Sequence, residues 1–211
     1  MSCIVIADDH PLFRAAIRLA LADLSGPEPE IEEASSFAAL DKLLERYGQA
    51  VVLVLLDLKM PGMQGLDGLL DLKKRFVELP VVIVSATEEP ALIRDALALG
   101  AAGYVPKSLQ RQEITAAIER VLAGEIFVPP QIELDLSPDP VIDAVQQLTP
   151  QQLKVLGLMV EGKPNKIIAY ELGIAETTVK AHITVILRKL GVFSRTQAVI
   201  AAQRLLRPAT G

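Results

Sequence analysis

Short runs rich in β-branched residues alternate with amphipathic stretches through the first 125 residues, and this alternation constrains the fold more than any other feature of the chain. In the first amphipathic stretch, apolar residues such as Phe13, Ile17 and Leu21 recur at helical spacing. Strands that alternate with helices predict an α/β domain with a doubly wound parallel sheet. The five runs of strand length are Cys3–Ala7, Glu30–Ala34 (the weakest), 51–56, Val81–Ser85 and Gly103–Pro106.

Composition excludes several other classes of protein. Apolar residues make up 51% of the 211-residue chain, enough to fill cores. No apolar run approaches the roughly 20 residues that a membrane-spanning helix needs, and no secretion signal opens the chain. Cys3 is the only cysteine, which excludes an intramolecular disulfide and a cysteine-based zinc site. We therefore expect a cytoplasmic protein without a membrane partner, in which Cys3 fills the core.

Charge divides the chain into three parts. Residues 1–125, the first domain, hold 12 basic and 19 acidic residues, a net charge of −7. Residues 126–146 hold four prolines, four acidic residues and no basic ones, which is typical of a linker. Residues 147–211, the second domain, hold nine basic and three acidic residues. Their net charge of +6 suits a nucleic-acid binder, unless the asymmetry is only chance surface composition.

Polar residues interrupt the predicted strands where each strand ends. Asp8 and Asp9 follow the first run, Asp57 the third and Lys107 the fifth, while Ser85 ends the fourth. The carboxyl ends of parallel strands lie at one edge of a sheet, so these side chains should converge. A hard divalent cation would relieve the repulsion between the carboxylates, and a carboxylate can also be phosphorylated as a nucleophile. Each Asp alone would be explained as a helix cap or turn residue; the joint pattern indicates a site.

Residues 1–125 resemble the receiver domain of two-component response regulators, which has a flavodoxin-like fold; the matching stretches are 6–11, 56–62 and 103–107. The resemblance implies that Asp57 accepts a phosphoryl group from a sensor histidine kinase. Lys107 would contact the phosphate. The implied ligands of a Mg²⁺ cofactor are Asp8, Asp9, Asp57 and the backbone carbonyl of Lys59.

The same resemblance implies a switch that responds to the phosphate. Ser85 would turn its hydroxyl toward the new phosphate, and Tyr104 would move inward with it. The alternative for Tyr104 is a strand aromatic whose hydroxyl stays at the surface. For His10 we expect a surface residue that caps the first helix, in preference to a role in phosphotransfer or metal binding.

Residues 165–190 have the pattern of a helix-turn-helix. Ile168 and Leu172 face inward from the first helix, and Gly173 permits the sharp turn that follows. In such a motif the second helix lies in the major groove of DNA. Its buried stripe is Val179, Ile183, Ile186, Leu187 and Leu190, and its opposite face carries Thr177, Lys180, Ala181, Thr184 and Arg188. A short helix pair is moderate evidence by itself, and the +6 charge strengthens it.

Residues 147–207 resemble the LuxR-type helix-turn-helix output domain of NarL/FixJ-type regulators; the matching stretches are 148–150, 165–166, 171–174, 178–182 and 188–192. The resemblance implies binding to double-stranded DNA. By this resemblance Lys180, Ala181 and Thr184 would face the bases. Phosphates would be contacted by Lys166, Thr178 and His182. Further contacts to DNA would come from Thr177, Arg188 and Lys189. His182 is alternatively a solvated helix residue. An active homodimer would use Val199, Ala202 and Leu206 of the last helix.

Local signals agree with helices in the second domain, with three departures from the usual pattern. Capping boxes start helices at Thr149 and Ser194. Gln152 replaces a frequent Glu and serves the first box equally well. Ala175 replaces a capping Ser, which should cost about 1 kcal/mol of helix stability. Ile167 replaces a common Glu, so an apolar side chain is either exposed or used in a contact.

Three functions are compatible with this organisation. The first is a transcription regulator in which the unphosphorylated first domain masks the second or holds it away from dimer geometry. In that scheme the linker acids Glu133, Asp135, Asp139 and Asp143 could shield the basic domain. The second is a phosphohydrolase, but a haloacid-dehalogenase-like enzyme needs Asp where Lys59 stands, so we expect only slow self-dephosphorylation of Asp57. The third is an interaction module that has lost DNA binding.

Overall fold

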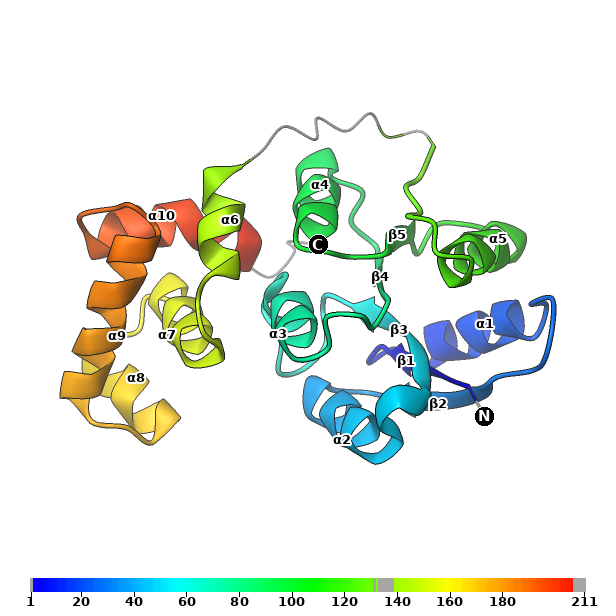
Figure 1. The fold of residues 1–211 in the computed structure, drawn as a ribbon, viewed down its shortest axis with the longest axis horizontal. Coiled ribbons are helices and arrows are strands. Elements are labelled where there is room, and N and C mark those ends of the chain that lie inside the picture. The colour runs from blue at the N-terminus through cyan, green and yellow to red at the C-terminus, as the bar shows by residue number, and fades with distance from the viewer. Residues whose placement is uncertain (1, 131, 133–138, 207–211) are drawn as a thin grey trace.

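The computed structural model describes residues 2–130, 132 and 139–206. Its N-terminal domain contains a parallel sheet with strand order β2-β1-β3-β4-β5 (Figure 1). This confirms the predicted doubly wound α/β fold, including the weakest strand. The strands are β1 (Cys3–Ala7), β2 (Glu30–Ala34), β3 (Val51–Asp57), β4 (Val81–Ser85) and β5 (Gly103–Pro106).

Helices cover both faces of the sheet, because alternate strand residues point to opposite sides. Ile4, Ile6 and Leu55 pack with the buried stripes of α1 (Pro11–Leu21) and α5 (Arg111–Leu122), which lie side by side in Figure 1. Val5, Ala7 and Leu56 belong to a second core. In the N-terminal domain this core includes residues of α2 (Phe37–Tyr47), α3 (Asp67–Arg75) and α4 (Pro90–Ala98), and it continues into the helices of the C-terminal domain. A short 3₁₀ turn, η1 (Gly48–Ala50), follows α2.

The predicted linker is partly built into the two domains. Phe127 forms an isolated parallel bridge with Gly103 and packs in the α1–α5 core. Residues 140–146 form a helix, α6 (Pro140–Gln146), which begins at Asp139 because the Asp139 carboxylate accepts a hydrogen bond from the Val141 amide. The predicted linker, 126–146, thus contains a bridge residue and a short helix in its described part. Glu133 and Asp135, two of its four acids, lie outside the described residues.

The C-terminal domain is entirely helical in its described part. The Thr149 capping box is confirmed: Thr149 Oγ1 accepts from the Gln152 amide at 3.3 Å, and Gln152 Oε1 accepts from the Thr149 amide at 3.1 Å. Gly173 adopts the left-handed conformation with φ of 63°, as the sharp turn requires. The helices are α7 (Pro150–Val160), α8 (Asn165–Leu172), α9 (Glu176–Lys189) and α10 (Arg195–Leu206).

The two domains pack against each other through α3 and α4 on one side and α6, α7 and α10 on the other. Across this boundary the Leu66 amide donates a 2.9 Å hydrogen bond to the Leu205 carbonyl. The Gln146 side chain donates to the Ala98 carbonyl at 2.9 Å. The Lys74 ammonium donates to the Leu148 carbonyl. None of the helices in the described part of the chain has the length and apolar character that crossing a bilayer requires.

Candidate functional site

The strand-end residues converge as the sequence predicts. Asp8, Asp57 and Ser85 are each at most 2% exposed at the carboxyl edge of the sheet. Lys107 Nζ lies 2.6 Å from Asp8 Oδ2 and 2.9 Å from Asp57 Oδ2. Burial disfavours the charged ammonium, but its close contacts and charge interactions with the carboxylates of Asp8 and Asp57 outweigh burial and raise the pKa of Lys107. A permanent positive charge is thus fixed beside Asp57. We call Asp8, Asp9, Asp57 and Lys107 the acidic pocket.

The acidic pocket has the donor set that a hard divalent cation requires. One oxygen from each of Asp8, Asp9 and Asp57, together with a ring nitrogen of His10, lie within 4.8 Å of one another. Two buried oxygens, Asp8 Oδ2 and Asp9 Oδ1, accept no well-aligned hydrogen bond from the described residues, although nitrogens of Lys107 and His10 lie close. Three carboxylates and one ammonium leave two negative charges uncompensated, which fits Mg²⁺. The Lys59 backbone carbonyl remains a predicted ligand; the Lys59 amide donates to Asp57 Oδ1 at 3.2 Å.

Tyr104 already points inward. Its side chain is fully buried, and its hydroxyl donates a 2.6 Å hydrogen bond to the Thr87 carbonyl. Burial raises the pKa of Tyr104 to about 12. The interpretation that left its hydroxyl at the surface was therefore wrong for this arrangement. Ser85 Oγ accepts from the Thr87 amide at 3.2 Å, so Thr87 connects the two predicted switch residues.

His10 is placed differently from our expectation. It occupies the position before α1, but its side chain makes no capping hydrogen bond there. Instead its Nδ1 lies 2.7 Å from Asp9 Oδ1 and 3.2 Å from Asp8 Oδ1, with 63% of the side chain exposed. The prediction of a capping role was wrong, while partial surface exposure was right.

Two further residues near the acidic pocket were missed from the sequence. The Phe13 ring lies under the Lys107 ammonium, 4.7 Å from its centroid, and confines that side chain. Arg14 donates to the Asp8 carbonyl at 2.7 Å and pairs with Glu33. Phe13 was noticed only as part of a helical stripe, and a single Arg in a helix carries no signal for this role.

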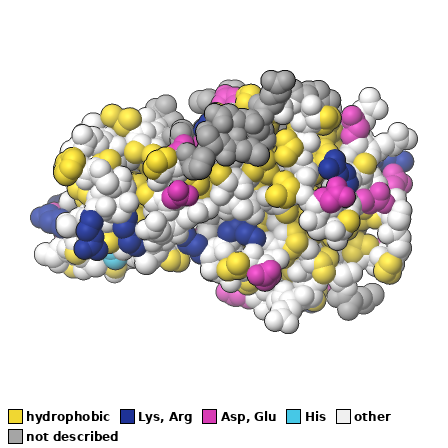
Figure 2. All heavy atoms as spheres, turned by 45° about the horizontal axis from the view of Figure 1, so that its top comes forward, with side chains coloured by type: hydrophobic (Ala, Val, Ile, Leu, Met, Phe, Trp, Pro, Cys, Tyr) yellow, Lys and Arg dark blue, Asp and Glu magenta, His cyan; other side chains and the backbone are white. Residues whose placement is uncertain are grey.

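The predicted DNA-facing side of α9 is open to solvent. Lys and Arg side chains gather on the C-terminal domain, at the left of Figure 2. His182 and Lys189 are half-buried. The exposed candidates are Lys166, Thr177, Thr178, Lys180, Ala181, Thr184 and Arg188. Most of the predicted contact surface is therefore accessible in this arrangement.

Two basic residues of this domain are engaged internally. The Lys189 ammonium donates to the Gln147 carbonyl at 2.7 Å and to Gln152 Oε1 at 2.9 Å, so it braces the start of α7. Arg195 donates to Asn165 Oδ1 at 2.9 Å and to the Lys163 carbonyl at 2.5 Å. Arg195 thus ties the start of α10 to the start of α8, a role that no sequence signal indicated.

The predicted dimer surface lies against the rest of this chain. Ala202 and Leu206 are fully buried and Val199 is half-buried. The C-terminal end of α10 meets the N-terminal domain through the Leu66–Leu205 hydrogen bond. In this arrangement Ala202 and Leu206 are therefore not accessible to a second chain, and their use by an active homodimer stays a prediction.

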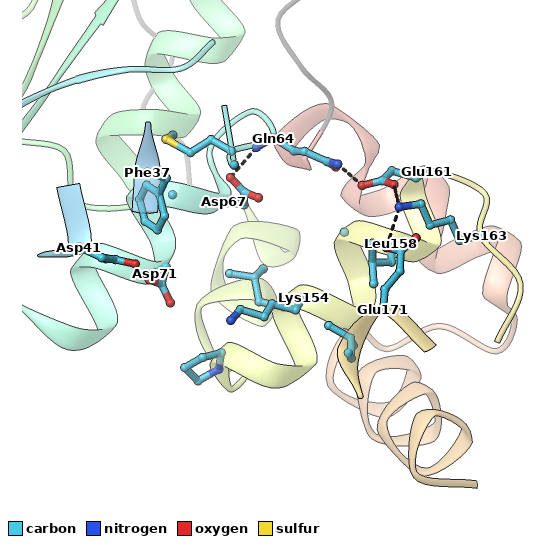
Figure 3. Close-up of a pocket in the computed structure, with 17 residues that line it drawn as sticks. Phe37, Asp41, Gln64, Asp67, Asp71, Lys154, Leu158, Glu161, Lys163 and Glu171 are labelled. Carbon is cyan, nitrogen blue, oxygen red and sulfur yellow. Dashed lines mark hydrogen bonds and ion pairs between the residues drawn. The ribbon is translucent and has the colours of Figure 1, made fainter. Parts of the chain in front are cut away.

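A cleft of about 500 Å³ separates α2 and α3 from α7 and α8 (Figure 3). Gln64 reaches across it to Glu161, which pairs with Lys163. Asp67 Oδ1 accepts a 2.8 Å hydrogen bond from the Gln64 amide. Burial, above all, raises the pKa of Asp67 to about 6, and the charges of Asp71 and Glu161 add to the shift. The domain boundary therefore contains a carboxyl group that ionises near neutral pH.

Comparison with known proteins identifies both domains. Residues 4–119 match the response regulator receiver domain, and residues 146–202 match the bacterial regulatory proteins of the luxR family. Over 215 aligned residues the chain is 44% identical to the glycerol metabolism activator of Pseudomonas putida, with 94% of each chain covered. It is 32% identical over 203 residues to the nitrate/nitrite response regulator protein NarL of Escherichia coli K12, with 93% of each covered.

Solved structures agree on the fold. RcsB from Salmonella enterica serovar Typhimurium, bound to promoter rprA in the presence of phosphomimetic BeF₃⁻, superposes with a TM-score of 0.57 at 22% identity, covering 97% of this chain and 99% of that chain. The family matches span both domains, and the relatives align over nearly their whole length. The chain therefore belongs to the response regulators that join a receiver domain to a luxR-family DNA-binding domain, and it is a transcription regulator.

Proposed function

We propose that Asp57 accepts a phosphoryl group from a sensor histidine kinase. The observation that carries the proposal is the pairing of Asp57 and Asp8 with one ammonium, that of Lys107, at 2.9 and 2.6 Å. Asp57 Oδ1 accepts the Lys59 amide, which leaves Oδ2 beside Lys107 as the nucleophilic oxygen. Lys107 holds a positive charge where the negative charge of the transferred group develops.

Mg²⁺ would be held by the carboxylates of Asp8, Asp9 and Asp57 and by the Lys59 carbonyl. When bound, it neutralises charge on the phosphoryl oxygens and on the carboxylates. The chain's own residues orient the nucleophile: Arg14 fixes the backbone at Asp8, and the Phe13 ring confines the Lys107 ammonium. Ser85 and Tyr104, the proposed switch residues, are linked through Thr87, whose amide donates to Ser85 Oγ and whose carbonyl accepts from the Tyr104 hydroxyl.

We propose that phosphorylation acts on dimerisation more than on access to DNA. The exposed face of α9 supports this choice, because the receiver does not cover the predicted base contacts. The hydrogen bond between the Leu66 amide and the Leu205 carbonyl also supports this choice, because it holds the C-terminal end of α10 against the receiver. Release of the receiver would free α10 to pair with a second chain, and two half-sites bind DNA more tightly than one.

The remaining partners follow from this scheme. The chain would bind double-stranded DNA through α9 and act in the cytoplasm, where DNA and kinase meet. The RcsB structure holds promoter DNA together with a phosphomimetic, which supports the same partners here. The only catalysis we propose is slow loss of phosphate from Asp57 itself. Turnover of a generic phosphate ester at enzyme-like rates would contradict this.

The phosphorylation step is tested with a small phosphodonor and Mg²⁺, followed by electrophoresis that retards phosphoproteins. Wild type should acquire one acid-stable, base-labile phosphoryl group, and Asp57→Ala should acquire none. Asp143→Ala, which changes an exposed acid of α6, is the control and should behave as wild type. Equal phosphorylation of wild type and Asp57→Ala would overturn the assignment.

A further inference from the structure

We infer that His10 is a nitrogen ligand of the metal site, so that the acidic pocket binds first-row transition ions such as Co²⁺ in marked preference to Mg²⁺. The inference rests on the proposed metal site and adds to it a fourth side chain. The carrying observation is the position of Nδ1, which lies 2.7 Å from Asp9 Oδ1, 3.2 Å from Asp8 Oδ1 and 3.9 Å from Asp57 Oδ2.

The backbone brings the ring to this position. The His10 amide donates a 2.8 Å hydrogen bond to Asp8 Oδ1, and Pro11 starts α1 immediately afterwards. The hydrogen bond between the His10 amide and the Asp8 carboxylate therefore fixes the short turn between β1 and α1, and with it the position of the His10 ring. His10 and Asp57 also line one open cleft of about 510 Å³, so a cation entering from solvent meets both.

Coordination explains the arrangement better than an isolated hydrogen bond. Nδ1 is within hydrogen-bonding distance of Asp8 Oδ1, at 3.2 Å, but it also lies within 4 Å of oxygens of Asp9 and Asp57, which one N–H cannot serve as well. Asp9 Oδ1, the closest of them, is buried and accepts no well-aligned hydrogen bond from the described residues. A cation held by Nδ1 and by one oxygen from each of Asp8, Asp9 and Asp57 would give these four ligand atoms a common partner.

The chemistry of the ligand atoms decides which ions bind more tightly when His10 is present. Carboxylate oxygens suit Mg²⁺, while an imidazole nitrogen adds affinity chiefly for Fe²⁺, Co²⁺, Ni²⁺ and Zn²⁺. Nδ1 is the coordinating atom here, which leaves Nε2 toward solvent. The pocket would then discriminate between ions through one side chain, and removal of that side chain should change the preference without abolishing Mg²⁺ binding.

The test uses the full chain without a histidine tag and measures Co²⁺ and Mg²⁺ affinities by calorimetry. The sequence has two histidines, so His182→Ala leaves His10 as its single imidazole and serves as the matched control. His10→Ala should weaken Co²⁺ binding about tenfold and leave Mg²⁺ binding within about twofold. His182→Ala should retain both wild-type affinities. Thermal melting checks that each variant folds.

Paramagnetic NMR supplies a readout independent of affinity. Co²⁺-loaded His182→Ala should show a strongly shifted, exchangeable imidazole N–H resonance, and His10→Ala should lack it. Absence of that resonance in both variants would overturn the inference. A gain in Co²⁺ affinity in His10→Ala would also overturn it, and would show that the imidazole competes with the metal for the carboxylates. Failure of wild type to bind either ion would instead count against the proposed metal site itself.

Discussion

The backbone amide of Leu66, in the loop before α3, donates a 2.9 Å hydrogen bond to the carbonyl of Leu205 in α10. One main-chain bond thus joins the segment that follows Asp57, the proposed phosphorylation site, to the helix that we expect to form the dimer. Because Leu205 and Leu206 are fully buried, the bond is shielded from water. Because of this bond, a displacement of the loop after Asp57 would move or release α10. The proposed coupling between phosphorylation and dimerisation can act through this contact.

Replacing Lys74 with alanine should loosen the docked arrangement. Its ammonium donates to the Leu148 carbonyl and, at 3.5 Å, to the Val145 carbonyl, both beyond the receiver. Loss of charged hydrogen bonds should raise the DNA affinity of the unphosphorylated protein by up to about tenfold, even though a positive charge is removed. Fluorescence anisotropy with a labelled duplex measures the change.

Lys73→Ala is the matched control, since its ammonium donates to the Val77 and Leu79 carbonyls inside the receiver. Lys73→Ala should leave DNA affinity unchanged. If both variants bind DNA as wild type does, Lys74 does not help hold the domains together.

Asp67→Asn should stabilise the protein at neutral pH. With a pKa raised to about 6, the native state favours the neutral carboxyl, and this contribution is complete below the ordinary value of 3.8 and lost as pH rises through 6. Between pH 4 and 7 the free energy of unfolding of the variant, measured by urea denaturation, should therefore rise above that of wild type by at most about 3 kcal/mol. Asn keeps the acceptor for the Gln64 amide.

Asp71→Asn, one helical turn later, serves as the contrasting variant, because it should lower the free energy of unfolding where Asp67→Asn raises it. Asp71 pairs with Arg75 at 2.6 Å, so the variant should lose stability at pH 7. A constant difference between wild type and Asp67→Asn across pH 4–7 would show that Asp67 is not desolvated at the domain boundary.

Tyr104→Phe should destabilise the receiver by about 1 to 2 kcal/mol, because the buried Thr87 carbonyl loses its 2.6 Å hydrogen bond. Denaturant unfolding measures the cost. Tyr170→Phe removes the hydroxyl of a side chain that is 85% exposed and should change stability by less than about 0.5 kcal/mol. Equal effects of the two variants would mean that the Tyr104 hydroxyl is not anchored inside.

Lys180→Ala should weaken DNA binding at every duplex tested and reduce the slope of log affinity against log salt by up to about one. Lys180 is exposed on α9 and pairs with Glu176 at 3.2 Å, an ion pair that phosphate can replace. Lys42→Ala, which removes an exposed charge from α2, should leave affinity and slope close to wild type. If Lys180→Ala left the slope of log affinity against log salt unchanged, Lys180 would not contact a DNA phosphate, and the proposed contact through α9 would be wrong.

The acidic pocket was predictable because topology alone assembles it. Asp57 and Lys107 are 50 positions apart, yet both end strands of a parallel sheet, so their meeting follows from the alternation of strands and helices. Helix boundaries were predictable for a different reason, because residues a few positions apart form the cap, as the Thr149 capping box shows. The start of α6 carried such a signal too, in Asp139 followed by Pro140.

Contacts that depend on side-chain conformation were beyond sequence reasoning. The direction of the His10 ring and the position of Phe13 under Lys107 follow from packing between elements. Arg195 reaches residues 30 and 32 positions away in the chain, for which periodicity gives no indication. The docking of α10 on the receiver depends on complementarity between two surfaces, and no local pattern encodes it.

The central claim is that phosphorylation of Asp57 controls DNA binding, and one measurement addresses it directly. DNA affinity and mass in solution are determined together for wild type and Asp57→Ala, each with Mg²⁺ and with or without a small phosphodonor. We predict that the donor converts wild type to a dimer that binds DNA more tightly, while Asp57→Ala stays monomeric at its basal affinity. Undiminished, equal binding by both proteins with and without donor would contradict the account.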